Sequence, residues 1–307
     1  MGLHRRFILF CLFFGLPLLF LYPPFLASDE PAHFYRAYQV SCFQPVSDVR
    51  DGEGGGLLPA SLPETVDTLF RNVYAKQGFT LKDLSDAPRL PLAARDKTWT
   101  AFTNTALYAP LPYLPQAAGL LVGRAVSLPP LSLLYLARLC SLLCWALMGA
   151  LALRTIPFYQ NALFMLLLTP LVFSKAAVVT ADVVTVGVCA LLVCQILKMA
   201  YGRTDPSRRD IWLLLGLAAL AGLCKITYAP LAGLALLIPA ERLGGRKRFW
   251  LVCGGTVLLA VSVNVIWTGF AATHLPLQTS AAADPGVQAR YILSQPFPFA
   301  KVVLKYT

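Results

Sequence analysis

Apolar runs of nearly the length needed to cross a bilayer recur along this chain of 307 residues. In lipid such a run must be a helix, because a helix satisfies its own backbone hydrogen bonds. With 57% hydrophobic and only 13% charged residues, the composition excludes an ordinary soluble domain. We therefore predict an all-α polytopic membrane protein with spans at 7–27, 131–153, 158–174, 182–201, 211–224, 226–240 and 249–269, about seven in all.

Three basic clusters orient these spans. They are HRR at 4–6, GRTDPSRR at 202–209 and ERLGGRKR at 241–248. Lys and Arg beside spans are retained in the cytoplasm, and seven crossings place all three clusters on one side. We therefore expect a cytoplasmic N-terminus. The stretch 211–240 is short for two crossings, so its helices are either short or a re-entrant pair bent at CKITYAP.

The charge distribution follows this topology. The net charge of +11 can indicate nucleic-acid binding, but no basic face with interleaved aromatic residues is present, so no nucleic-acid partner is predicted. The segment 28–128 holds ten of the fifteen acidic residues and is expected to fold outside the cytoplasm. We divide the chain into an anchor at 1–27, this outer segment, a helix bundle at 129–270 and a second outer segment at 271–307.

The outer segment contains several predicted elements. EPAHFYRAYQV reads as an amphipathic helix lying along the membrane interface, and PETVDTLFRNVYAK at 63–76 as a second helix. DVRDGEGGGLLP reads as a flexible loop, because its glycines lack the Lys-Ser/Thr of a phosphate-binding loop. YAPLPYLPQAAGLLVGRAV at 108–126 suits a segment that returns to the headgroups.

Cysteine and histidine usage indicates no metal site. Seven of the eight cysteines fall within predicted spans, where they act as small apolar residues. The remaining one, Cys42, has no evident partner for a disulfide in the outer segment. With only three histidines in the chain, we expect no zinc site built by the protein.

The stretch SDEPAH, residues 28–33, stands where the chain leaves the first apolar run. One interpretation is helix capping. Ser28 or Asp29 would be the N-cap, Glu30 would favour the first turn, and Pro31 would stand where its missing N–H costs nothing.

The other interpretation is functional. On the helix that begins there, Glu30 and His33 are three residues apart and share a face, with Arg36 or Phe34 one turn further on. A carboxylate, an imidazole and a guanidinium would then line one side of a helix at the membrane surface. Spacing alone leaves both interpretations open.

The stretch DEPAHFYRAYQ, directly after a first transmembrane helix, resembles the signature of a bacterial membrane family, domain of unknown function 2142. Further stretches follow in the order of that family, so the resemblance covers nearly the whole chain. They are YAPLPYLPQ, LARL, TPLVFSKAAVVTADVVTVG, KITYAPLAGL and DPGVQARYILSQPFPF.

That family is similar in layout to the C-type (GT-C) glycosyltransferases, which take a sugar from a polyprenyl-phosphate carrier outside the membrane. Protein mannosyltransferases of that fold carry an Asp-Glu-x-His-Phe motif at the same place. This sequence has one residue more between Glu30 and His33. The resemblance implies a location in the bacterial inner membrane.

The implied reaction needs a carboxylate to activate the acceptor hydroxyl and cations to hold the departing phosphate. By match to the motif, Asp29 is the expected general base and Glu30 the second candidate. His33 and Arg36, on the same helix, are candidates for substrate binding. No cofactor is predicted, and the need for a divalent cation stays open.

Cations expected near the outer leaflet are candidates for binding the phosphate. Arg138 lies within the second span, where an ionisable residue usually faces a cavity or a partner; alternatively, its side chain extends to the headgroups. Lys175 and Lys225, at outer turns, have the same two interpretations. Asp182 is either a helix N-cap or a partner of Lys175, and Tyr228 is either an interfacial aromatic or a phosphate contact.

Two functional classes follow. The first is a glycosyltransferase that moves a sugar from a polyprenyl-phosphate carrier to a cell-envelope glycan or lipid. The second is a transporter or assembly protein for surface polysaccharide, in which no bond is made. The absence of an evident inverted repeat with broken helices argues against transport.

The C-terminal segment is expected to be incomplete. It contains a predicted amphipathic helix at 285–293 and then ends on VVLKYT. In the resembling family more transmembrane helices follow. We therefore expect a groove that is open on one side and poor packing at 295–307.

Overall fold

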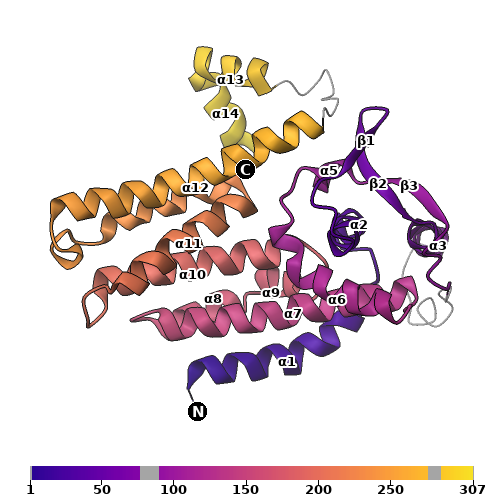
Figure 1. The fold of residues 1–307 in the computed structure, drawn as a ribbon, viewed down its shortest axis with the longest axis horizontal. Helices are drawn as coiled ribbons and strands as arrows, with labels where there is room; N and C mark the ends of the chain where they lie inside the picture. The colour runs from indigo at the N-terminus through magenta and orange to yellow at the C-terminus, as the bar shows by residue number, and fades with distance from the viewer. Residues whose placement is uncertain (1, 77–89, 276–284, 307) are drawn as a thin grey trace.

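Helices dominate the computed structural model, which describes residues 2–76, 90–275 and 285–306. Within these ranges, four helices are long and apolar enough to cross a membrane: α1 (Leu3–Leu21), α7 (Pro130–Thr155), α10 (Asp182–Tyr201) and α12 (Arg246–His274). A shorter helix, α11 (Arg208–Cys224), packs between the last two. These helices run side by side in the order α1, α7, α10, α11, α12 (Figure 1).

The apolar run at 158–174 is not one helix. It forms α8 (Gln160–Leu167) and α9 (Pro170–Ala176). Pro170 has no N–H to continue α8, and the residue before a proline is disfavoured in helical conformation, as the extended backbone of Thr169 illustrates. The predicted continuous span is therefore wrong.

The run at 226–240 also differs from the prediction. It forms a 3₁₀ helix, η2 (Ile226–Leu237), with Pro230 inside it, followed by the short η3 (Glu241–Leu243). The chain bends at Lys225, whose backbone is extended, within the CKITYAP stretch where a bend was expected. The count of seven spans is thus not confirmed; by length and composition the described residues contain four.

The first helix ends before residue 27, its predicted boundary. α1 stops at Leu21, and Tyr22 is extended. Pro23 and Pro24 follow directly, and a residue before proline is driven out of the helical region. The chain therefore leaves the bundle earlier than its hydrophobicity suggests.

The outer segment packs at one end of the bundle (Figure 1). It holds a three-stranded antiparallel sheet in the order β1-β2-β3, which the sequence reasoning missed. Its described elements are α2 (Glu30–Ser41), β1 (Asp48–Arg50), β2 (Glu53–Pro59), α3 (Ser61–Lys76), β3 (Lys97–Ala101), α5 (Thr103–Ala106), η1 (Leu111–Tyr113) and α6 (Leu114–Ala125). The helix predicted at 63–76 is α3.

The glycine run lies in β2 and is not the predicted loop. Gly55 pairs with Ala101 of β3, and a Cβ on Gly55 would lie 2.3 Å from the Thr100 carbonyl oxygen. Real Cβ atoms do not approach so closely, so only glycine fits there without a backbone shift. The glycines allow close contact between strands.

The helix predicted from EPAHFYRAYQV is present as α2, but it is not an exposed amphipathic helix. Ten of its twelve residues are buried. Phe34, Ala37 and Tyr38 belong to a core that also takes residues from α3, α6 and α7. The expected amphipathic surface helix is therefore a central element of the outer segment.

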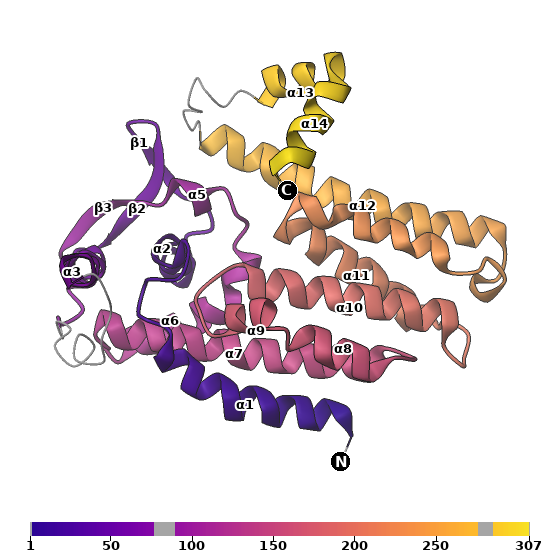
Figure 2. The ribbon, with the colours of Figure 1, turned by 180° about the vertical axis from the view of Figure 1, so that it is seen from behind.

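The turns at 202–207 and 244–245 lie at the same end of the bundle as the N-terminus, opposite the outer segment (Figure 2). Beyond α12, α13 (Pro285–Ser294) realises the helix predicted at 285–293, and α14 (Pro296–Tyr306) follows it. The described residues of 295–307 are poorly packed, as expected; Phe297 is 86% exposed and Leu304 81%.

Candidate functional site

Asp29 occupies the N-cap position of α2 but does not cap it. Its φ of 58° lies in the left-handed region, which aspartate tolerates better than most residues. The exposed carboxylate accepts a hydrogen bond from Asn104 Nδ2 at 3.0 Å. The capping interpretation is therefore wrong for the Asp29 side chain, whose carboxylate is exposed at the end of the bundle where residues 28–128 pack.

Glu30 and Arg138 form a fully buried ion pair. Arg138 Nη2 and Nε lie 2.6 and 2.8 Å from the two carboxylate oxygens of Glu30. Its remaining N–H groups donate to the carbonyl oxygens of Leu19, Tyr22 and Pro23. Every donor of the guanidinium is thereby used.

The predictions for these two residues did not include this pairing. Glu30 also accepts hydrogen bonds from the backbone N–H groups of Phe25 and Val179, so its carboxylate is held inside the protein. The Arg138 guanidinium is likewise fully buried and does not extend to the surface. The pair joins α2 and α7 to the end of α1, which is a structural role.

Arg36 is also structural. It is fully buried, and Nη2 donates to the carbonyl oxygens of Pro45 and Tyr108. Burial lowers the pKa of Arg36 to about 10, so it stays charged at neutral pH. Its charge is therefore used within the outer segment, and its predicted role in substrate binding stays a prediction.

Asp182 forms ion pairs with both candidate lysines. Its carboxylate oxygens lie 2.8 Å from Lys225 Nζ and 3.8 Å from Lys175 Nζ. Ala181 is the N-cap of α10, so the capping role for Asp182 is wrong and the pairing with Lys175 is present. These three side chains are between 26 and 40% exposed, which leaves them within reach of a ligand.

His33 lies next to this group. Its Nδ1 is 2.8 Å from the Tyr113 hydroxyl, and its ring stacks on Tyr108, whose ring also lies 5.4 Å from Lys225 Nζ. Burial is the main reason that the pKa of His33 falls to about 4. At neutral pH the imidazole is therefore uncharged.

The charges of Asp182 and Asp29 raise this pKa, and those of Lys225 and Lys175 lower it. All four charges are therefore near His33. We call Asp29, His33, Lys175, Asp182 and Lys225 the outer cluster. Sequence reasoning proposed each member, but the fold brings them together from three helices, α2, α9 and α10, and the end of α11.

A cavity of about 220 Å³ opens beside the outer cluster, lined by Trp145, Lys175, Asp182 and Tyr228 together with aliphatic residues. Val172 and Val186 belong both to this cavity and to an apolar groove of about 710 Å³. That groove runs between α8, α10 and η2 and is lined almost wholly by carbon. A cavity with charged residues in its wall thus adjoins an apolar groove.

A family model described as "Predicted membrane protein (DUF2142)" matches residues 12–307. The chain belongs to this family. Comparisons with curated proteins and with solved structures gave no match.

This DUF2142 member has a further cavity, of about 280 Å³, which Lys225 helps to line. Tyr108, Asn264, Trp267 and Thr268 contribute aromatic rings and hydrogen-bonding groups to its wall. The Trp267 indole donates to the Leu107 carbonyl oxygen at 3.0 Å, which ties α12 to the outer segment. Sequence reasoning missed Tyr108, Tyr113 and Trp267, although YAPLPYLPQ was singled out.

Proposed function

We propose that this DUF2142 protein transfers a sugar from a polyprenyl-phosphate carrier to a hydroxyl group of a cell-envelope glycan or lipid, outside the bacterial inner membrane. One observation carries the proposal: the cavity lined by Lys175 and Asp182 adjoins an apolar groove, and Val172 and Val186 line both. A polyprenyl phosphate has this combination of an anionic head and a long apolar chain. The groove would hold part of that chain within the bundle.

The charged groups suit the departing phosphate. Lys175 and Lys225 supply two positive charges, and the Asp182 carboxylate lies 2.8 Å from Lys225 Nζ and 3.8 Å from Lys175 Nζ. Asp29 adds a second negative charge to the outer cluster, so the cluster has no net charge, and the two lysines are its cations that would stabilise the charge that develops on the leaving group. The neutral His33 adds a hydrogen-bonding nitrogen without adding charge.

Asp29 is the proposed general base. Its exposed carboxylate would take the proton from the acceptor hydroxyl while the oxygen attacks the anomeric carbon of the sugar. The bond from that carbon to the phosphate oxygen breaks, and its electron pair leaves with the phosphate. The products are the glycosylated acceptor and the polyprenyl phosphate. The reaction needs no oxidant or reductant.

The test uses membranes that contain the full chain and a radiolabelled polyprenyl-phosphate sugar. Wild type should release or transfer the label, and Asp29→Asn should slow this by roughly a hundredfold or more, as expected for loss of a general base. Asp48→Asn, which removes an exposed carboxylate from β1, is the matched control and should be unaffected. Equal rates for Asp29→Asn and wild type would exclude Asp29 as the base.

Absence of release or transfer by wild type would contradict the enzyme and favour the transport or assembly class. Binding of the carrier can be measured in the same membranes. Lys175→Gln and Lys225→Gln should weaken it, whereas Arg154→Gln, at the opposite end of α7, should not. The binding measurement therefore distinguishes a protein that binds the carrier without transferring the sugar from one that does not bind the carrier.

A further inference from the structure

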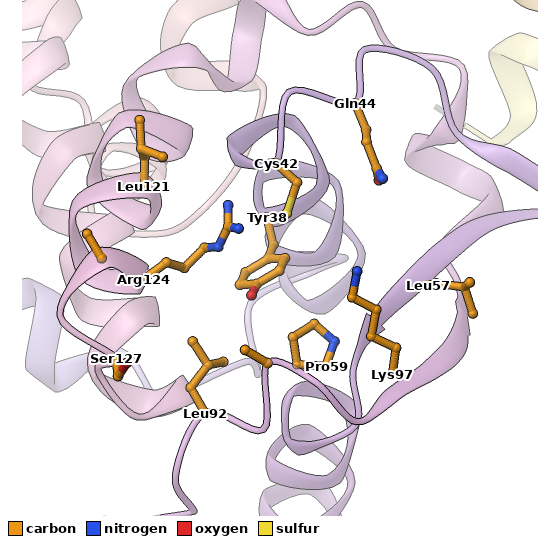
Figure 3. A pocket seen from close by; sticks show the side chains of 12 residues that line it. Tyr38, Cys42, Gln44, Leu57, Pro59, Leu92, Lys97, Leu121, Arg124 and Ser127 are labelled. Atoms are coloured by element: carbon orange, nitrogen blue, oxygen red, sulfur yellow. The ribbon is translucent and has the colours of Figure 1, made fainter.

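A cavity of about 320 Å³ lies in the outer segment, between the C-terminal ends of α2 and α6 and the strands β2 and β3 (Figure 3). Its residues are distinct from those of the outer cluster. Figure 3 shows the Arg124 guanidinium and the Lys97 ammonium directed into a common space, with the Gln44 amide on its far side. The proposed function makes no use of this cavity.

Its charge predicts an anionic ligand. The described lining contains two cations, Arg124 and Lys97, and no carboxylate. Arg124 is held in place, because Nη1 donates to the carbonyl and hydroxyl oxygens of Ser41 and the guanidinium lies 5.0 Å from the centre of the Tyr38 ring. Lys97, by contrast, is exposed and able to adjust to a ligand.

The adjoining face of α6 is apolar and exposed. Leu114, Ala118, Leu121, Val122 and Ala125 are all exposed and repeat at the spacing of one helix face. On a membrane protein such a face suits contact with acyl chains. Leu121 and Ala125 also line the cavity, so the apolar face leads directly to the two cations.

The packing of α6 on α7 gives the depth of Arg124. Gly123, its neighbour, contacts Leu133 of α7. Two residues further along α7, Tyr135 stacks on Phe20, which lies in the last turn of α1. Since α1 ends its apolar run there, the end of α6 that carries Arg124 lies near the end of the bundle where α1 stops, which is where headgroups are expected.

We propose that this cavity binds the headgroup phosphate of an anionic phospholipid from the outer leaflet. Arg124 and Lys97 hold the phosphate, and the acyl chains lie along the apolar face of α6. Basic pockets at the ends of membrane helices recognise anionic headgroups in this way. The inference is independent of the glycosyl-transfer proposal, because it uses none of the outer-cluster residues.

Native mass spectrometry of the full chain, released from micelles, tests the proposal. The probes are phosphatidylglycerol, phosphatidylcholine with the same acyl chains, and water-soluble glycerol 3-phosphate. Wild type should retain phosphatidylglycerol in preference to phosphatidylcholine. Lys97→Gln should reduce that retention roughly fivefold, the effect expected for one basic contact at a membrane surface.

Arg95→Gln is the matched control, because it removes one exposed positive charge two residues away without altering the cavity lining. It should leave retention unchanged. Equal retention of the two lipids by wild type, or equal losses in Lys97→Gln and Arg95→Gln, would overturn the proposal. Displacement of phosphatidylglycerol by an equal concentration of glycerol 3-phosphate would show a site for soluble anions and exclude the lipid.

Discussion

At the scale of single residues, the buried pair of Glu30 and Arg138 should have the largest effect on stability. Arg138→Leu leaves the Glu30 carboxylate buried with only two backbone donors, and loss of one partner from such a pair costs about 3–5 kcal/mol. Thermal unfolding in detergent should therefore occur at a clearly lower temperature. Arg154→Leu, at the exposed end of α7, should unfold like wild type.

The double variant Glu30→Gln/Arg138→Leu tests whether the stability is lost because the buried Glu30 charge has no partner. If that charge causes the loss, the double variant should be more stable than Arg138→Leu alone. An Arg138→Leu protein as stable as wild type would mean that this pair does not hold the helices together.

His33 gives the second prediction at this scale. The folded protein lowers its pKa from the ordinary 6.5 to about 4, so the unfolded chain binds the proton more readily. Stability from the neutral imidazole is therefore fully present above about pH 6.5 and lost as the pH falls towards 4, by about 3 kcal/mol in total.

Unfolding temperatures measured between pH 7 and pH 4 for wild type and His33→Gln should show this. The difference between the two proteins isolates His33 from the carboxylates that titrate in the same range. Wild type should lose more stability than the variant. Parallel curves would contradict the burial of a neutral histidine.

At the scale of elements, the β2 strand depends on close contact at Gly55. Gly55→Ala places a Cβ against the Thr100 carbonyl oxygen and should destabilise the protein by about 1–3 kcal/mol, as overpacking does. Gly216→Ala in α11 is the control, because nothing lies within 4 Å of the added atom. It should be neutral or slightly stabilising in the same thermal assay.

The elements also show what the sequence can predict. The boundaries of α10 match those predicted at 182–201, because an uninterrupted apolar run has one solution in lipid. The run at 158–174 was predicted as one span because it is apolar throughout. The break that Pro170 causes after α8 was therefore missed. The glycine run of β2 was missed because glycine normally weakens a strand, and its role there appears only once β3 is beside it.

In the candidate site, too, local features were predicted and contacts between distant parts of the sequence were missed. Local spacing identified Asp29 and His33, since both lie in one short motif. The pairing of Glu30 with Arg138 was missed because the two residues are 108 positions apart, and no spacing rule reaches that far. The link between Asp182 and Lys225, 43 residues apart, was missed for the same reason.

At the scale of the whole molecule, orientation in the membrane gives the last prediction. Single cysteines are introduced at Asp48 and at Arg203 in a protein carrying Cys42→Ala. In intact spheroplasts a membrane-impermeant thiol reagent should label the first site and not the second. After permeabilisation both should react, and the reverse pattern would invert the topology on which the outer cluster depends.

The Glu30–Arg138 pair also bears on how the chain is made. Glu30 is synthesised long before α7, so during translation its carboxylate is at first unpaired and in water next to the first span. Arg138 arrives inside a span, where an unpaired arginine raises the cost of insertion by roughly 2.5–3.5 kcal/mol. The Glu30 carboxylate can pair with that arginine as α7 enters the membrane. We therefore expect α7 to insert into the membrane more efficiently when the native N-terminal region precedes it than when it is translated alone.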